Sequence, residues 1–253
     1  MSSYKTSEIA YHTGIHPNTV RLYEELKLIP KPKRKENGYR IFTEFHMEQM
    51  RLVRMALKIE VLQNGLRKQV ITIIKTSALG DLNGAIRLAQ DYLQQIRREQ
   101  GHAEEAITLT EKLMAGDCGE TDTTVFTRKA AADHLGISMD TLRNWEMNGL
   151  LTVKRKQNGY RIYTNDDIRR LKIIRSLRCA NYSLSAILRM LNTLSHNPMA
   201  NIRQTIDTPQ EDEDIISVGD KLQTALKHAE QNALRMIAHL EKMKQQFQTN
   251  PTL

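Results

Sequence analysis

The spacing of apolar positions along this chain of 253 residues predicts a mainly α-helical protein. Two long segments, residues 78–117 and 217–249, carry apolar residues alternately three and four positions apart, which is the heptad pattern of a coiled-coil helix. Two polar positions, Gln100 and Thr110, interrupt the first of these seams. The seam positions are Leu82, Ile86, Ala89, Leu93, Ile96, Gln100, Ala103, Ile107, Thr110 and Met114, followed by Leu222, Leu226, Ala229, Ala233, Met236, Leu240, Met243 and Phe247.

The segments that precede the two long helices repeat each other. HTGIHPNTVRLYEELKLI at 12–29 aligns with HLGISMDTLRNWEMNGLL at 134–151, and NGYRIFT at 37–43 aligns with NGYRIYT at 158–164. The offset changes from 122 to 121 between the two blocks, so the second copy lacks one residue in a connection that tolerates it. We expect one small domain twice, at residues 1–77 and 125–196, with linkers at 118–124 and, acidic in composition, at 197–216.

Each copy begins with two short helices separated by a tight turn. Gly14 and Gly136 stand where a left-handed residue ends the first helix. Pro17 fits only at the start of the second helix, because it has no amide proton to donate within a helix. Helix, glycine turn and helix form the helix-turn-helix pattern, whose second helix enters the major groove of DNA.

A basic segment and an Asn-Gly pair follow the second helix in both copies. Asn-Gly tolerates positive φ at both residues, so the pair predicts a two-residue type I′ turn and a small β-hairpin wing. Thr43 and Thr164 are positioned to cap a third helix, the latter with Asp167 in a capping box. A shorter fourth helix is expected around residues 67–75 and 183–191.

Charge and composition narrow the partners. Lys plus Arg number 37 against 29 Asp plus Glu, a net charge of +8, which favours double-stranded DNA first and an anionic membrane surface second. No apolar run spans a bilayer, and the N-terminus has no signal-peptide core, so we expect no membrane association and a cytoplasmic location. Cys118 and Cys179 stand apart without metal-ligand spacing, and we expect no metal and no cofactor. No phosphate loop, catalytic carboxylate pair or nucleophile arrangement is present, which argues against an enzyme.

The pattern T-x-R-x-Y/W-E, then NGYRI-F/Y-T and a capped helix, resembles the DNA-binding head of the MerR family of bacterial transcription regulators. The resemblance implies a winged helix-turn-helix head and a long helix that pairs antiparallel with a second subunit. It also implies a pseudo-palindromic promoter site whose spacer DNA is untwisted so that RNA polymerase engages. This chain departs from the family by having two heads. We therefore expect a monomeric, intramolecular pseudo-dimer; a homodimer with four heads is the alternative.

The residues expected to contact DNA lie on the second helix and the wing of each copy. Arg21 and Arg143 can reach a phosphate or a guanine edge, or else pair with a glutamate within the helix. Thr19 and Thr141 either contact phosphate or support the helix cap. Lysines of the wing would add phosphate affinity that does not depend on sequence, unless they form only a solvated loop. The full candidate set is His16, Asn18, Thr19, Arg21, Lys33, Tyr39, Arg40, Ser138, Thr141, Arg143, Lys156, Tyr160 and Arg161.

Three aligned pairs of positions have different expected roles. Tyr23 and Trp145 are expected to pack in the core, and aligned histidines at 12 and 134 are expected to stabilise a helix end. Asn18 and Asp140 occupy one aligned position with different chemistry, because Asn binds adenine whereas Asp repels phosphate. The two heads are therefore expected to read different half-sites.

Control by an effector has little support in the sequence. No appended sensor domain is expected beyond the second seam. An effector would most simply lie between the heads and the seam helices, or near residues 207–216. The simplest interpretation of residues 207–216 is a solvated linker. An architectural or bridging DNA-binding protein, of the excisionase or chromosome-anchoring kind, remains the alternative to a transcription regulator.

Overall fold

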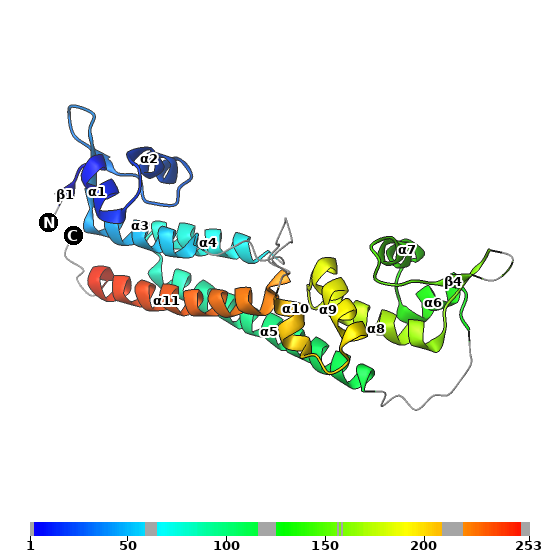
Figure 1. Cartoon of the computed structure of the whole chain (residues 1–253). Coiled ribbons are helices and arrows are strands. Elements are labelled where there is room, and N and C mark those ends of the chain that lie inside the picture. Colours follow the sequence, from blue (N-terminus) through cyan, green and yellow to red (C-terminus); the bar gives the residue numbers. More distant parts are fainter. Residues whose placement is uncertain are drawn as a thin grey trace. The chain divides into compact units, whose positions relative to one another are not determined.

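A computed structural model of the whole chain provides the coordinates (Figure 1). The chain divides into two compact units, the first formed by Met1–Arg97 with Ala225–Leu253 and the second by Arg98–Thr224. The described residues are 3–58, 65–115, 125–155, 157, 159–208 and 220–248. Outside these ranges lie Lys156, Asn158, the 118–124 linker with Cys118, and most of the acidic segment after Thr208.

The first head contains the helices and the wing that the repeat predicts. Gly14 takes φ 62° directly after α1, and Pro17 is the first residue of α2. Strand β3 pairs antiparallel with β2, which forms the wing, and with β1 on its other side. The elements are β1 (Ser3–Tyr4), α1 (Thr6–Thr13), α2 (Pro17–Glu25), β2 (Lys33–Arg34), β3 (Arg40–Thr43), α3 (Glu44–Ala56) and α4 (Leu66–Ala78).

The turn of the first wing differs from the predicted one. Arg34 pairs with Arg40, the Lys35 amide donates to the Tyr39 carbonyl at 2.9 Å, and the Gly38 amide donates to the Lys35 carbonyl at 2.8 Å. Gly38 has φ 80°, but Asn37 is not among the described residues with positive φ. The two-residue type I′ prediction was wrong, because the loop has three residues and only its glycine is left-handed.

A buried glutamine holds the first head together behind its apolar core. Gln49 of α3 is fully buried and donates to the carbonyls of Leu28 and Ile74, both at 2.9 Å, while Ser77 donates to its side-chain oxygen at 2.7 Å. The amide nitrogen and the amide oxygen of Gln49 therefore both have hydrogen-bond partners inside the protein, as burial of a side-chain amide requires. The core itself includes Ile9, Val20, Phe42, Met50, Leu52, Val53, Ile73 and Ile74.

Two long helices complete the first unit: the N-terminal part of α5 (Leu82–Met114) and nearly all of α11 (Leu222–Gln248). Arg97 of α5 pairs with Glu230 of α11 at 2.8 Å. The predicted seam positions of α11 from Leu222 to Met243 are buried, as are most of those of α5. Met114, the last predicted position of the α5 seam, is instead 42% exposed.

The second unit contains a head with the same order of elements. Gly136, with φ 60°, ends its first helix, and Thr164 caps α8 in a reciprocal capping box with Asp167. Phe126 and Tyr163 exchange backbone hydrogen bonds where the first head pairs β1 with β3. The elements are α6 (Arg128–Leu135), α7 (Met139–Met147), β4 (Lys154–Arg155), β5 (Arg161–Ile162), α8 (Asn165–Cys179) and α9 (Leu184–His196).

One segment predicted as linker is a packed helix. Within residues 197–216, α10 (Ile202–Asp207) lies along α9, and its side chains Ile202 and Ile206 are buried. The linker prediction was wrong there because it rested on the acidic composition, which is concentrated after Thr208, rather than on the two isoleucines four positions apart.

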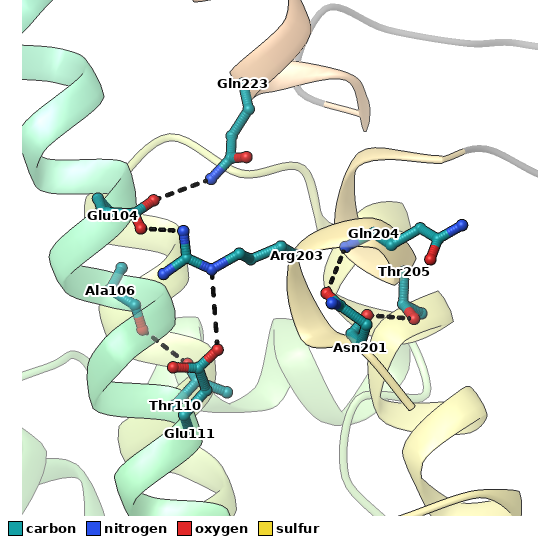
Figure 2. Close-up of polar contacts among 9 residues, drawn as sticks. All are labelled: Glu104, Ala106, Thr110, Glu111, Asn201, Arg203, Gln204, Thr205 and Gln223. Atoms are coloured by element: carbon teal, nitrogen blue, oxygen red, sulfur yellow. Dashed lines mark hydrogen bonds and ion pairs between the residues drawn. The ribbon is translucent and has the colours of Figure 1, made fainter. Parts of the chain in front are cut away.

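The polar interruptions of the α5 seam have a simple explanation at one position. Thr110 is buried, and its hydroxyl donates to the Ala106 carbonyl of its own helix at 2.8 Å (Figure 2).

Among the described residues, no helix combines the length and the apolar character needed to cross a membrane.

Candidate DNA interface

The second helix of each head begins with a side-chain cap at the residues predicted to approach DNA. In the first head, Nδ1 of His16 accepts from the Asn18 amide at 3.2 Å. In the second, the Ser138 hydroxyl accepts from the Thr141 amide at 3.0 Å. The two caps are chemically different, but each satisfies one of the amides that a helix leaves unpaired at its start.

Polar side chains on the first turns of these helices are exposed. His16, Asn18 and Arg21 of the first head are exposed, and Nη1 of Arg21 donates to Oδ1 of Asn18 at 3.0 Å. This internal bond orients both side chains on one face of α2. In the second head the aligned residues Asp140 and Arg143 are also exposed.

The two threonines of the candidate set are less exposed than the arginines. Thr19 and Thr141 are half-buried. The Thr141 hydroxyl lies 2.9 Å from the Ser138 hydroxyl, so it takes part in the helix cap. This contact favours the supporting role that the sequence left open for Thr141.

The wing places its tyrosine outward. Tyr39 is 71% exposed and Tyr160 is 73% exposed. The neighbouring basic strand stabilises the turn, because Arg34 donates to the Gly38 carbonyl at 3.3 Å and Arg155 to the Gly159 carbonyl at 3.5 Å. Lys33 and Lys154 are exposed beside them.

The wing arginines have a partner inside the protein that sequence reasoning did not assign. Nε of Arg40 lies 2.6 Å from Glu24, and Nε of Arg161 lies 2.8 Å from Glu146, so each ion pair joins the wing to the second helix. Both arginines are half-buried. A guanidinium has five N–H donors, so a bond through Nε is compatible with a phosphate contact. The available signal was the glutamate repeated at the aligned positions 24 and 146.

Glu146 has ion-pair and hydrogen-bond partners beyond the wing arginine. Nη2 of Arg128 lies 3.2 Å from its carboxylate, and the Tyr163 hydroxyl donates to the other carboxylate oxygen. Burial first, and then the hydrogen bond to Glu146, raise the pKa of Tyr163 well above its usual value. The second head therefore has a cluster of four polar side chains at the base of its wing, where the first head has the Arg40–Glu24 ion pair and, in place of Tyr163, Phe42.

The aromatic and histidine expectations separate into core and surface. Trp145 is buried, and Tyr23 is half-buried with its pKa raised by burial, against an opposing effect of Arg54. Both positions therefore pack, as expected. His12 and His134 are exposed and stand edge-on or tilted against Tyr4 and Phe126, at ring-centre distances of 5.8 and 5.6 Å.

Within the described part of the chain, no group of three or more His, Cys, Asp or Glu side chains is arranged to hold a metal ion. Cys179 is an exposed thiol.

Two helix-turn-helix heads, each with a β wing and each followed by a long helix, define a tandem winged helix-turn-helix protein. A family model described as "MerR HTH family regulatory protein" matches residues 126–194, and one described as "MerR family regulatory protein" matches residues 5–42. The two matches support a MerR-type regulator with tandem heads, one in each half of the chain. The matched family consists of DNA-binding regulators rather than enzymes.

Several bacterial regulators are similar to part of the chain. It is 42% identical over 53 residues to the HTH-type transcriptional regulator CueR of Yersinia pestis, which is 21% of this chain and 38% of that protein. It is 40% identical over 53 residues to the HTH-type transcriptional regulator YfmP of Bacillus subtilis, with the same coverage of 21% and 38%. An uncharacterised HTH-type regulator of the same species, YyaN, is 28% identical over 120 residues, 44% of this chain and 87% of its own length. No solved structure is significantly similar to the chain.

Proposed function

We propose that this chain is a DNA-binding transcription regulator of the MerR type that works as a pseudo-dimer, with both heads of the usual dimer supplied by one molecule. Its two heads bind unlike half-sites of a pseudo-palindromic promoter and distort the DNA spacer between the promoter elements. The distortion aligns these elements so that RNA polymerase can engage them. The observation that carries this proposal is the packing of α11, which follows the second head in the chain, against the first head.

Three contacts make that packing specific. Nε2 of His239 lies 2.9 Å from the Glu48 carbonyl of α3, and Nδ2 of Asn232 donates to the Met55 carbonyl at 3.1 Å. Phe247 stands edge-on to Phe45 at 5.2 Å (Figure 1 shows α11 beside α3). The polar contacts bring side chains of α11 to backbone carbonyls of α3, so the two helices are held by polar as well as aromatic contacts.

The second unit has the reciprocal arrangement. Asn181, at the end of α8, donates to Glu99 of α5 at 3.2 Å, and Gln223 donates to Glu104 of α5 at 3.4 Å. Each head thus packs on the long helix that follows the other head.

The mass in solution tests the pseudo-dimer. Light scattering behind size exclusion should give the mass of one chain, 29.1 kDa, at low micromolar concentration. A mass of two chains that does not fall on dilution would mean that the seams pair between molecules and that the assembly has four heads.

Binding to DNA follows from the exposed caps, tyrosines and lysines of the two wings and from the net charge of +8. Phosphate neutralisation should make affinity fall steeply with salt. DNA selected by the intact protein from a random library should contain two half-sites that are not inverted copies. The reciprocal exchanges Asn18→Asp and Asp140→Asn should each alter the preference of one half-site, because Asn binds adenine and Asp does not. A clean inverted repeat would contradict unlike reading by the two heads.

An architectural role is the competing proposal, since the same heads bind DNA without acting on polymerase. Transcription from a selected site with purified bacterial RNA polymerase separates the two. A change in transcript level that depends on the spacer length supports regulation by distortion, whereas occupancy without any change supports the architectural role.

A further inference from the structure

The connection from head to long helix differs between the two halves of the chain. In the first half, α4 ends at Ala78 and α5 begins at Leu82. In the second half, α9 ends at His196 and α11 begins at Leu222, with α10 in between. The first half has no counterpart of α10, because residues 79–81 are too few to form one.

A buried arginine holds α10 to the second head. Arg189 of α9 is 7% exposed, and it donates to the carbonyls of Thr205 at 3.2 Å and Ile206 at 3.3 Å, in the last turn of α10. It also donates to the Asp220 carbonyl at 3.4 Å, two residues before α11. A cation at a helix C-terminus is favourable because the unpaired carbonyls carry partial negative charge.

The last residue of α10 also caps the next helix. The Asp207 carboxylate accepts from the amides of Gln223 at 2.9 Å and Thr224 at 3.2 Å, and from the Thr224 hydroxyl at 2.6 Å. A carboxylate on the first amides of a helix is both a cap and a favourable charge for the helix dipole. The start of α11 is therefore attached to α10 by side chain as well as by sequence.

On its other side α10 reaches α5 through Arg203. Arg203 forms an ion pair with Glu104 and lies 3.9 Å from Glu111, and Gln223 donates to the same Glu104 (Figure 2). Glu104 and Glu111 are seven residues apart, so they lie two turns apart on one face of α5. Because the Arg203 guanidinium reaches two carboxylates on α5, it fixes the orientation of α10 along α5 as well as its point of contact.

We propose that α10 is a brace and that Arg203 is a positioning residue, which sets the second head on the C-terminal part of α5 and so orients α7 for its half-site. The proposal rests on the proposed DNA-binding function. Arg203, Glu104 and Glu111 are each about half exposed, so their pairing contributes little to global stability. Its effect is on the docking of α10 against α5, while Arg189 and the buried isoleucines attach α10 to the second head.

Charge reversal isolates this effect. In the full chain, Arg203→Glu places a third carboxylate beside Glu104 and Glu111, and adding Glu104→Lys and Glu111→Lys restores opposite charges in the swapped sense. Arg169→Gln is the control, because it removes an exposed ion pair with Asp166, at 3.4 Å, inside α8 of the same head. Hydrogen exchange at residues 202–207 and 222–226 reports whether α10 stays docked.

The DNA measurement assigns each head to its half-site. Both native cysteines are first changed to serine. A single new cysteine, Gln157→Cys in the second wing or Glu36→Cys in the first, then carries an iron chelate. The chelate cleaves the selected duplex next to the wing that carries it. Arg203→Glu should weaken protection of the second half-site about 3- to 10-fold and speed exchange of α10, while the first half-site and the thermal transition stay near wild type. The triple variant should restore both.

Other outcomes decide against the brace or against its premise. Equal loss at both half-sites, or faster exchange of α10 with unchanged protection, overturns the positioning role. Failure of the triple variant to restore protection overturns the assignment to Glu104 and Glu111. If the wild-type protein protects neither half-site, the DNA-binding proposal fails, whereas exchange rescued by the triple variant would still establish α10 as a brace between the second head and α5.

Discussion

Replacing Glu146 by glutamine should loosen the second head at the root of its wing. The carboxylate receives Nε of Arg161 at 2.8 Å, Nη2 of Arg128 at 3.2 Å and the Tyr163 hydroxyl, and its side chain is only 9% exposed. Glutamine keeps the size and one oxygen that can still accept from Tyr163. It removes the negative charge that both guanidinium groups face, and it adds an NH2 group that only donates.

The expected cost follows from the exposure of the partners. Removing one member of a fully buried ion pair costs about 3–5 kcal/mol, because a charge is left without compensation. Arg128 and Arg161 keep 27% and 32% of their side chains exposed, so water recovers part of that cost. We expect the free energy of unfolding of the second head to fall by about 2 kcal/mol.

The only tryptophan of the chain provides the assay. Trp145 is buried in α7 next to Glu146, so its fluorescence during urea unfolding reports the second head. With a urea dependence of about 1.5 kcal/mol per molar, the midpoint should move down by about 1 M. Glu24→Gln is the matched control. It alters the aligned carboxylate of the first head, which pairs with Arg40, and should leave the Trp145 transition unchanged.

Two results would refute this reasoning. A Glu146→Gln midpoint within about 0.3 M of wild type, which is about 0.5 kcal/mol, would mean that the cluster is solvated and energetically neutral. An equal shift of the Trp145 transition in Glu24→Gln would mean that the fluorescence does not isolate the second head.

Three further perturbations have defined directions. Burial lowers the pKa of His46, so the stability that the neutral imidazole contributes should be lost as the pH falls from the unfolded value of about 6.5 through the folded pKa. Protection factors of the α3 amides, which correct for the slower intrinsic exchange at low pH, should be smaller at pH 5 than at pH 7.5, and His46→Asp should abolish this difference. The pKa of Tyr163 is raised above its ordinary value of 10.0, so the second head should lose stability as the pH rises above that value; urea midpoints from Trp145 fluorescence at pH 8 and 10.5 should differ less in Tyr163→Phe, and an unchanged difference would contradict the assignment. Asn232→Ala removes a buried hydrogen bond to α3 and should cost about 1 kcal/mol in the first unit, seen as faster exchange at the end of α3; unchanged exchange there would show that α11 does not stabilise the first head.

Much of the candidate site could be predicted from local pattern. The helix caps, the left-handed glycines and the exposed wing tyrosines all depend on a few neighbouring residues, which the repeat displays twice. The role of Arg40 and Arg161 could not be predicted in this way, because their partners Glu24 and Glu146 lie 16 and 15 positions away and meet them only when the wing folds back onto the second helix. The turn type was missed for a related reason, since Asn-Gly is compatible with more than one hairpin loop and strand register selects between them.

By itself, the sequence determined the two heads, their order of elements and the two heptad seams, because periodicity and turn chemistry act over one or two helical turns. Only the tertiary structure decided that α11 packs on α3 of the first head, that α10 is a helix fastened by Arg189, and that Arg203 reaches Glu104. A heptad seam encodes a buried face without encoding which surface covers it. That choice depends on contacts such as His239 with Glu48, which join residues 191 positions apart in the chain.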